Sequence, residues 1–291
     1  MIPGVSSQIF HSERLGPAHA AAISQAGFTL TEAYTYPGHF ELGDEAHARA
    51  VRDAFDDHGV TLISLHAPFF DERKSGTASR GRLSISSARP AARAAALDAV
   101  RRCADIAAIL GARILVIHFG DGGDKNTHAV IENLFSSMLH IEDILLGTGI
   151  TAAYENIGTP TSLCGYIANM LDRYEMRQAG VCLDIGHANI NEDPATAVER
   201  AGARLAHIHA SDNSGHEDQH NPPFLGSVRW DRVMPAILKS GYRGAFIFEP
   251  RFQPEPVKLL HHLRALFEKL SLLAQGENPN EMESDTPFPN C

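Results

Sequence analysis

The chain has 291 residues, of which 44% are hydrophobic and 21% are charged. This composition supports a full hydrophobic core and excludes a wholly disordered chain, and no apolar run approaches the roughly 18 residues that span a bilayer. We therefore expect no membrane partner. The net charge of −10 excludes a chain-wide basic surface and so disfavours nucleic acid as a partner.

Short apolar runs alternate along the chain with Ala-rich segments of helical spacing, and several of these segments end at a glycine. The predicted strands are Gly4–Ser7, Thr29–Tyr34, Val60–His66, Arg113–His118, Ile150–Glu155, Val181–Asp184, Leu205–His209 and Ala245–Glu249. Helical spacing predicts helices over Asp44–His58, Ala91–Leu110 and Thr127–Leu146. Near-continuous apolar runs such as Ile114–Ile117 are typical of strands buried on both faces, as in a parallel sheet.

This alternation predicts an α/β fold, a single (β/α)8 TIM barrel with parallel strands, over residues 1–274. A doubly wound open sheet is the alternative, but no Gly-rich phosphate-binding turn follows the first strand.

Two segments interrupt the alternation of strands and helices. A Gly- and Ser-rich loop covers Asp71–Ser87, and the acidic, Pro-rich tail 275–291 is expected to be disordered.

The cysteines and the first residues bear on the compartment. The four cysteines form no CxxC pair, and the opening MIPGVSSQIF lacks the basic and apolar regions of a signal peptide. We therefore expect a reducing, cytoplasmic environment.

Acidic and histidine side chains gather at the predicted strand ends, where TIM barrels carry their active sites. The third to eighth strands end at His66, His118, Glu155, Asp184, His209 and Glu249. Carboxylates and neutral imidazoles are ligands of zinc and manganese, and a divalent cation would relieve the repulsion between carboxylates at an enclosed mouth. We expect Glu155, Asp184, His209 and Glu249 to form a first metal site. The alternative is that some of these groups are ion-paired rim residues.

Further candidate ligands surround that set. His187 lies three residues after Asp184, and the loop after His209 carries the pair Asp218-x-His220. In an extended segment the two members of that pair project to the same side, so they could complete another metal site with His187. The alternative is a polar loop that contains histidine by chance.

Seven short motifs occur in an order that resembles the xylose isomerase-like barrels. They are SLHAPF, IHFG, YEN, LDIGHAN, HIHASDN, a D-x-H pair and FEP, and the resemblance covers Met1 to Leu273. That superfamily includes sugar and sugar-phosphate isomerases and epimerases, and also abasic-site nucleases of the endonuclease IV type.

Similarity to the epimerases implies one divalent ion, Mn, Zn, Mg or Co, on Glu155, Asp184, His209 and Glu249. It also implies that Glu155 and Glu249 exchange protons with a carbon next to a carbonyl through an enediolate, while His187 holds a substrate hydroxyl. One departure from this pattern is the missing arginine between His209 and Leu225, which in ketose epimerases usually meets the substrate.

Similarity to the nucleases implies up to three zinc ions and phosphodiester hydrolysis. His66 and His118 would hold the first ion, with Glu155 bridging to a second ion on Asp184, His209 and Glu249. A third ion would take His187, Asp218 and His220. This chain departs from that pattern because the D-x-H pair is followed by PPFLGSVRW, with Ser227 where a glutamate is usual.

The sequence therefore predicts a metal-dependent isomerase or epimerase of a small sugar or polyol, with or without a phosphate. The candidate substrate-binding cations are Arg73, Lys74, Arg80, Arg82 and Arg251. The alternatives are a multinuclear zinc phosphodiesterase, a lyase or dehydratase on the same metal site, and a catalytically inactive metal-binding barrel. The sequence does not indicate the oligomeric state.

Overall fold

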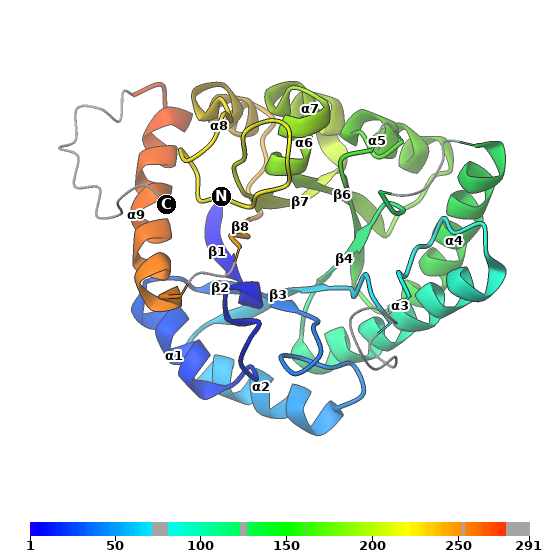
Figure 1. Cartoon of the computed structure of the whole chain (residues 1–291), viewed down its shortest axis with the longest axis horizontal. Coiled ribbons are helices and arrows are strands. Elements are labelled where there is room, and N and C mark those ends of the chain that lie inside the picture. Colours follow the sequence, from blue (N-terminus) through cyan, green and yellow to red (C-terminus); the bar gives the residue numbers. More distant parts are fainter. Residues whose placement is uncertain (72–80, 123–126, 160, 252–253, 278–291) are drawn as a thin grey trace.

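The computed structural model describes residues 1–71, 81–122, 127–159, 161–251 and 254–277. Eight parallel strands pair in sequence order into a closed barrel, with β8 returning to β1. Figure 1 shows the strands at the centre and the helices around them. The strands are β1 Ile2–Ser6, β2 Leu30–Tyr34, β3 Thr61–His66, β4 Ile114–His118, β5 Thr151–Glu155, β6 Ala179–Asp184, β7 Leu205–Ala210 and β8 Ala245–Phe248.

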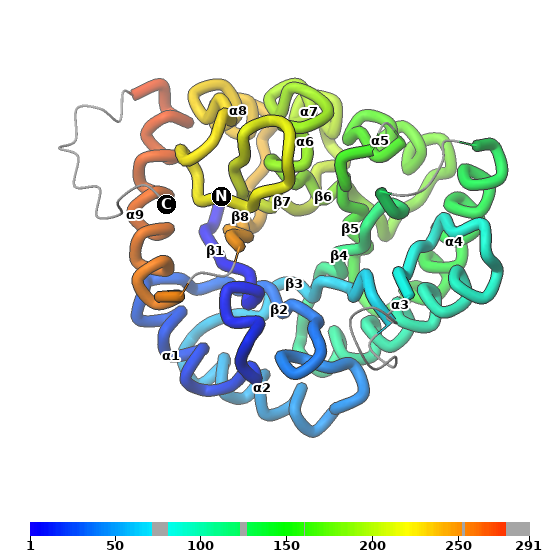
Figure 2. The backbone as a smooth tube through the Cα atoms, in the orientation of Figure 1, coloured from blue at the N-terminus to red at the C-terminus, as the bar shows by residue number. Residues whose placement is uncertain are grey.

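Helices follow every strand and form the outer layer, as the tube in Figure 2 makes plain. Among the described residues they are α1 Pro17–Gln25, α2 Glu45–Asp57, α3 Pro90–Leu110, α4 His128–Leu145, α5 Cys164–Arg173, α6 Ile185–Asn191, α7 Pro194–Ala201, α8 Trp230–Lys239 and α9 Pro256–Ala274. Two short 3-10 turns, η1 Ser7–Phe10 and η2 Gly202–Arg204, complete the elements. The predicted single (β/α)8 barrel is thus confirmed.

The boundaries of the elements follow local chemistry. Pro90 occupies the first turn of α3, where its missing N–H costs nothing, and α3 ends at Gly111, whose φ of 72° lies in the left-handed region. The Thr127 side chain accepts a hydrogen bond from the Val130 N–H and begins α4. The expectation of one helix after each strand is wrong at β6, because Asp193 and Pro194 start a second helix directly after the short α6.

Residues alternate between the two faces of each strand, which sets the positions of the site residues. Outward side chains pack under the helices in the main core, whereas Val116, Ala153 and Cys182 form a separate small cluster. These three residues lie two positions before His118, Glu155 and Asp184, so they share a strand face with them one layer deeper. The acidic and histidine side chains of the inner face therefore lie at the carboxyl ends of the strands, above an apolar cluster.

The barrel is tightly closed at its first strand. An added Cβ at Gly4 would lie 2.5 Å from Ile247 Cδ1 and 2.9 Å from the Leu30 carbonyl oxygen, so only glycine fits between β2 and β8 there.

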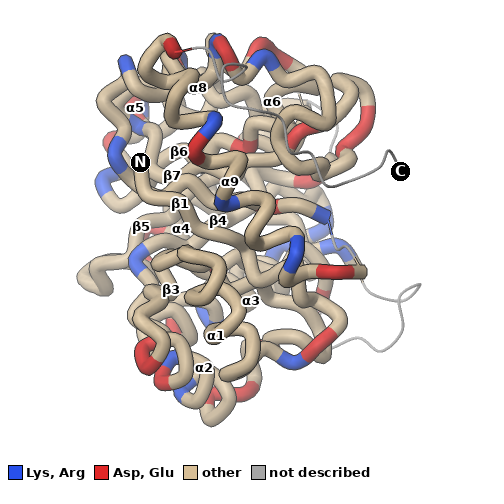
Figure 3. The backbone as a smooth tube through the Cα atoms, turned by 90° about the vertical axis from the view of Figure 1, so that its left-hand side faces the viewer, with Lys and Arg blue, Asp and Glu red and all other residues tan. Residues whose placement is uncertain are grey.

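The surface carries both signs of charge. Figure 3 shows Lys and Arg interspersed with Asp and Glu on the face turned to the viewer. None of the described helices combines the length and apolar character that crossing a membrane requires. Most of the predicted loop, including Arg73, Lys74 and Arg80, and most of the predicted tail lie outside the described residues.

Candidate active site

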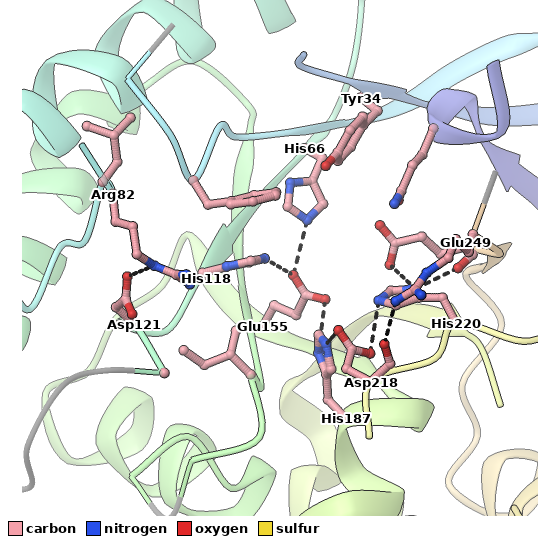
Figure 4. A pocket seen from close by; sticks show the side chains of 17 residues that line it. Tyr34, His66, Arg82, His118, Asp121, Glu155, His187, Asp218, His220 and Glu249 are labelled. Carbon is pink, nitrogen blue, oxygen red and sulfur yellow. Dashed lines mark hydrogen bonds and ion pairs between the residues drawn. The ribbon is translucent and has the colours of Figure 1, made fainter. Parts of the chain in front are cut away.

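A pocket of about 320 Å³ opens at the carboxyl ends of the strands. Figure 4 shows imidazole and carboxylate side chains from opposite sides of the barrel pointing toward one another across it. The lining residues that bear titratable groups are Tyr34, His66, Arg82, His118, Asp121, Glu155, His187, Asp218, His220, Glu249 and Arg251. The pocket is therefore polar and lies where the fold predicts an active site.

Four side chains at the base of the mouth converge closely. Glu155, Asp184, His209 and Glu249 are all buried, and one ligand atom from each lies within 4.8 Å of the others. His209 Nδ1 lies 3.1 Å from both Glu155 Oε1 and Glu249 Oε2. Parallel pairing accounts for this convergence, since β6 places Asp184 opposite His209 of β7.

Asp184 provides the test of whether this set fits a cation. Its Oδ1 accepts the His187 N–H at 2.7 Å and so begins α6, whereas its Oδ2 is buried without a hydrogen-bond partner. Burial raises the pKa of Asp184 despite the nearby His187 and His220. A buried carboxylate oxygen without a hydrogen bond is costly, and here it lies close to two other carboxylates and an imidazole nitrogen. A divalent cation bound between these four groups would satisfy the oxygen and reduce the repulsion between the carboxylates.

Two further histidines meet Glu155 from the opposite side. His66 Nε2 lies 3.2 Å and His118 Nε2 lies 3.3 Å from Glu155 Oε2. Burial alone would lower the pKa of His66, but the hydrogen bond and negative charge of Glu155 raise it to about 9. Burial likewise opposes ionisation of Glu155, yet His209 and His118 hold its pKa well below the ordinary value. Glu155 is thus the side chain that joins the two groups.

A third group lies on the loop after β7. Asp218 lies 3.4 Å from His187 Nε2 and 3.1 Å from His220 Nε2. Asp184, His187 and His220 also bring one ligand atom each within 4.8 Å of the others. His220 adopts a φ of 48°, uncommon outside glycine and enriched at functional sites.

Three of the histidines share one orientation. The Nδ1 atoms of His66, His187 and His220 lie 2.7 to 2.9 Å from the backbone carbonyl oxygens of Ala67, Asn156 and Glu249. If Nδ1 donates to each carbonyl, Nε2 of the neutral ring carries the lone pair, and in each case it faces a carboxylate in the pocket. This arrangement is the one in which histidine ligates a metal.

Two of the predicted substrate-binding cations, Arg82 and Arg251, line the pocket. Arg82 is paired with Asp121 and lies over the Phe70 ring, 5.6 Å from its centroid. Arg251 donates from Nη2 to the Asp218 carbonyl oxygen at 2.9 Å. Both could meet a substrate, whereas Arg73, Lys74 and Arg80 cannot be placed because they lie outside the described residues.

A deeper pair of residues, Glu32 and His207, is not predicted from the sequence. Both are fully buried, and Glu32 Oε2 lies 3.1 Å from His207 Nε2 and 3.2 Å from His209 Nε2. The sequence does carry a signal. Each lies two residues before the predicted carboxyl end of its strand, Tyr34 or His209, and so on the same strand face as that end residue. A charged residue at such a position needs a partner.

Comparisons with known proteins agree with this architecture. The family model described as xylose isomerase-like TIM barrel matches residues 20–269. An uncharacterised protein of Methanocaldococcus jannaschii is 25% identical over 279 residues, which cover 91% of this chain and 89% of that protein. The D-psicose 3-epimerase of Enterocloster bolteae is 30% identical over 109 residues, 37% of this chain and 34% of the epimerase. The crystal structure of a D-tagatose 3-epimerase-like protein superposes with a TM-score of 0.79 at 23% identity, covering 95% of this chain and 99% of that one.

Proposed function

The chain belongs to the xylose isomerase-like TIM barrel family, and from that premise we propose that it is a divalent-metal-dependent epimerase or isomerase of a small sugar. The observation that carries the proposal is the convergence of Glu155 and Glu249 on one pocket with Asp184 and His209, their ligand atoms within 4.8 Å of one another. Two carboxylates beside one reacting carbon can remove a proton from one face of that carbon and supply a proton to the other face.

Glu155, Asp184, His209 and Glu249 would hold the cation, using Asp184 Oδ2, which has no hydrogen-bond partner, and the inward-facing His209 Nδ1. When bound, a divalent ion polarises a carbonyl and its neighbouring hydroxyl and so makes the adjacent C–H bond more acidic. Metal dependence is part of the proposal, as is the choice among Mn, Zn, Mg and Co.

The two glutamates would do the proton transfer. Burial opposes the charge on both, but His209 lowers the pKa of both carboxyls, so each is an anion able to accept a proton. One carboxylate takes the proton from the carbon beside the carbonyl, which leaves an enediolate. The other glutamate, which has first taken up a proton from the solvent, delivers that proton to the opposite face, so the configuration at that carbon inverts. The first glutamate then releases the proton that it took to the solvent.

His187 and the walls of the pocket would orient the substrate. His187 lines the pocket with its Nε2 toward Asp218, where it can exchange a hydrogen bond with a sugar hydroxyl. The Phe69 ring stacks on His118, with centroids 5.3 Å apart, and offers an apolar face to the C–H groups of a sugar. A pocket of about 320 Å³ suits one monosaccharide.

The comparisons support a ketose as the substrate. The relative of Enterocloster bolteae is a D-psicose 3-epimerase, and the superposed crystal structure is of a D-tagatose 3-epimerase-like protein. We therefore propose inversion next to the carbonyl of a ketose, with Arg251 as a candidate partner for a phosphate group if the substrate carries one.

The test is a substrate screen in deuterated water. Protein loaded with Mn²⁺ or Co²⁺ is incubated with ketopentoses, ketohexoses and their phosphates, and the products are analysed by NMR. We expect deuterium at the carbon that inverts, and no incorporation in protein stripped with a chelator. Turnover with no solvent deuterium at that carbon would contradict proton transfer through Glu155 and Glu249.

A zinc phosphodiesterase is the second candidate, and one observation favours it. All nine candidate ligands lie in or directly beneath one pocket, and three of the histidines present Nε2 to carboxylates. The net charge of −10 does not favour a nucleic-acid backbone as the substrate. Hydrolysis of a small phosphodiester or an abasic-site duplex by the Zn²⁺-loaded protein, with three ions per chain, would establish this candidate and displace the first.

A further inference from the structure

Below the proposed metal ligands lies a second layer of polar side chains inside the barrel. It consists of Glu32, Ser64 and His207, which we call the lower polar layer, and all three are fully buried. Each lies two residues before a residue at the level of the pocket: Tyr34, His66 or His209. The matching positions on β4, β5 and β6 hold Val116, Ala153 and Cys182, so this level of the barrel is polar on one side only.

We propose that Glu32 is a positioning residue for the cation site: it fixes the ring of His209 so that Nδ1, and not Nε2, faces Glu155, Asp184 and Glu249. The inference rests on the metal site of the proposed function and names a residue outside the proposed ligand set.

The contacts of His209 carry this assignment. Its Nε2 lies 3.2 Å from both oxygens of Glu32, and its Nδ1 lies 3.1 Å from Glu155 Oε1 and from Glu249 Oε2. Glu32 has only acceptor atoms when ionised, so the ring proton toward it resides on Nε2 and the lone pair of the neutral ring resides on Nδ1. A carboxylate behind a metal-binding histidine fixes both its tautomer and its orientation.

Glu32 is itself held from two other strands. Ser64 Oγ donates to Glu32 Oε2 at 2.8 Å, and His207 Nε2 lies 3.1 Å from the same oxygen. These partners leave little freedom for the carboxylate to turn away from His209. A charged group at this depth is costly, and well-packed apolar residues would serve stability as well or better. The polar side of the layer therefore calls for an explanation other than packing.

Two irregularities in strand pairing lie beside the lower polar layer. Between Thr31 and Glu32 the β2–β3 register skips a residue, so Glu32 lies opposite Ser64. Between Val181 and Cys182 the β6–β7 register skips another, so Cys182 lies opposite His207 and Asp184 opposite His209. Bulges re-aim side chains and are frequent beside active sites. Both irregularities adjoin this layer and set which residues lie opposite Glu32 and His207 in the neighbouring strands.

The test measures Co²⁺ affinity and the Co²⁺ absorption spectrum, neither of which requires a substrate. Wild type is compared with Glu32→Ala, Glu32→Gln and Ser64→Ala, and folding of each metal-free protein is checked by circular dichroism. The matched control is Val116→Ala, which alters the same level of the barrel beneath His118. We expect Glu32→Ala to weaken Co²⁺ binding 10- to 100-fold and to change the spectrum. Glu32→Gln, which can still accept from Nε2, should recover part of the loss. Val116→Ala should stay within about twofold of wild type.

Several results would overturn the proposal. Equal affinity of wild type and Glu32→Ala would show that Glu32 does not position His209, and an equal loss in Val116→Ala would show a general packing effect. If the wild type bound two Co²⁺ ions per chain and Glu32→Ala bound one, Glu32 would be a metal ligand and not a positioning residue. If Glu32→Ala does not fold, Glu32→Gln and Ser64→Ala replace it in the test. Both variants should weaken Co²⁺ binding, by a smaller factor than is expected for Glu32→Ala. An unchanged Co²⁺ affinity in both would contradict the inference. A wild type that binds no cation contradicts both proposals, whereas one that binds Co²⁺ without turning over any sugar contradicts only the proposed function.

Discussion

Glu155 links the two sides of the pocket. Its Oε2 faces His66 and His118, and its Oε1 faces His209, so one carboxylate belongs both to the proposed cation site and to the outer histidines. Glu249 contacts His209 in the same way from β8. Substitutions of the two glutamates and of His118 should therefore have different effects.

Replacing either glutamate by glutamine removes the proton-accepting oxygen and a negative charge from the proposed cation site. We expect Glu155→Gln and Glu249→Gln each to lower kcat by about 10²- to 10⁴-fold, the usual contribution of acid–base catalysis. The assay is turnover at saturating metal, with Glu45→Gln, an exposed change on α2, as the control. A wild-type rate in either variant would remove that residue from the mechanism.

His118 separates the one-ion from the three-ion hypothesis. It contacts Glu155 but is not among the four converging ligands. For a one-ion epimerase we expect His118→Ala to leave about one ion per chain by elemental analysis. For the three-ion alternative, the same variant should lose an ion together with phosphodiesterase activity.

Cation affinity should depend on pH through His209. Burial alone would lower the pKa of His209, but neighbouring acidic groups, Glu32, Glu249 and Glu155 among them, raise it well above the ordinary value in the metal-free protein. Binding must then displace a proton, so affinity should rise with pH, by up to tenfold per pH unit while the ring is protonated. Calorimetry in buffers of different ionisation enthalpy should detect the released proton, and an affinity independent of pH from 6 to 8 would refute this.

At the scale of elements, the alternation of strand residues and the parallel order of the strands place the site. Both the strand alternation and the strand order could be predicted from the sequence. Four strands end as expected, at His66, His118, Glu155 and Asp184, whereas His209 lies one residue before the end of β7 and Glu249 lies one residue beyond β8. The role of Glu32 could not be predicted, because its partners depend on the two register shifts, and a skipped residue leaves no mark in a single sequence. The second helix after β6 was missed because α6 is one short segment capped by the proposed ligand Asp184 itself.

The loop between β7 and α8 is held by Asp212. This buried carboxylate accepts from the backbone N–H groups of Phe224 and Val228 and from Trp230 Nε1 at 2.9 to 3.1 Å. The same loop carries Asp218 and His220, so its shape determines where they lie.

Asp212→Ala would leave several buried donors without acceptors. We expect a loss of about 2–5 kcal/mol in the free energy of unfolding and a weaker affinity for substrate, because Asp218 and His220 lose their support. Chemical denaturation followed by fluorescence of Trp230 measures the first effect. Asp231→Ala, on an exposed pair with Arg229, is the control and should change stability by less than about 1 kcal/mol. A similar small change in Asp212→Ala would contradict the anchoring role.

At the scale of the whole molecule, the barrel brings together residues separated by more than two hundred positions, as Glu32 and Glu249 are. Barrel closure was predictable because apolar runs and helical segments alternate along nearly the entire chain. The pairing of Arg82 with Asp121 was not, since it depends on loop conformation that no periodicity encodes. The family match covers residues 20–269, which include most of the barrel whose carboxyl strand ends surround the pocket.

Anomalous diffraction from crystals grown with Mn²⁺ tests the central claim most directly. We expect a manganese peak bounded by Glu155, Asp184, His209 and Glu249, with His209 ligating through Nδ1. A fully loaded crystal whose manganese peaks all lie elsewhere, with those four side chains bonded only to one another, would contradict it.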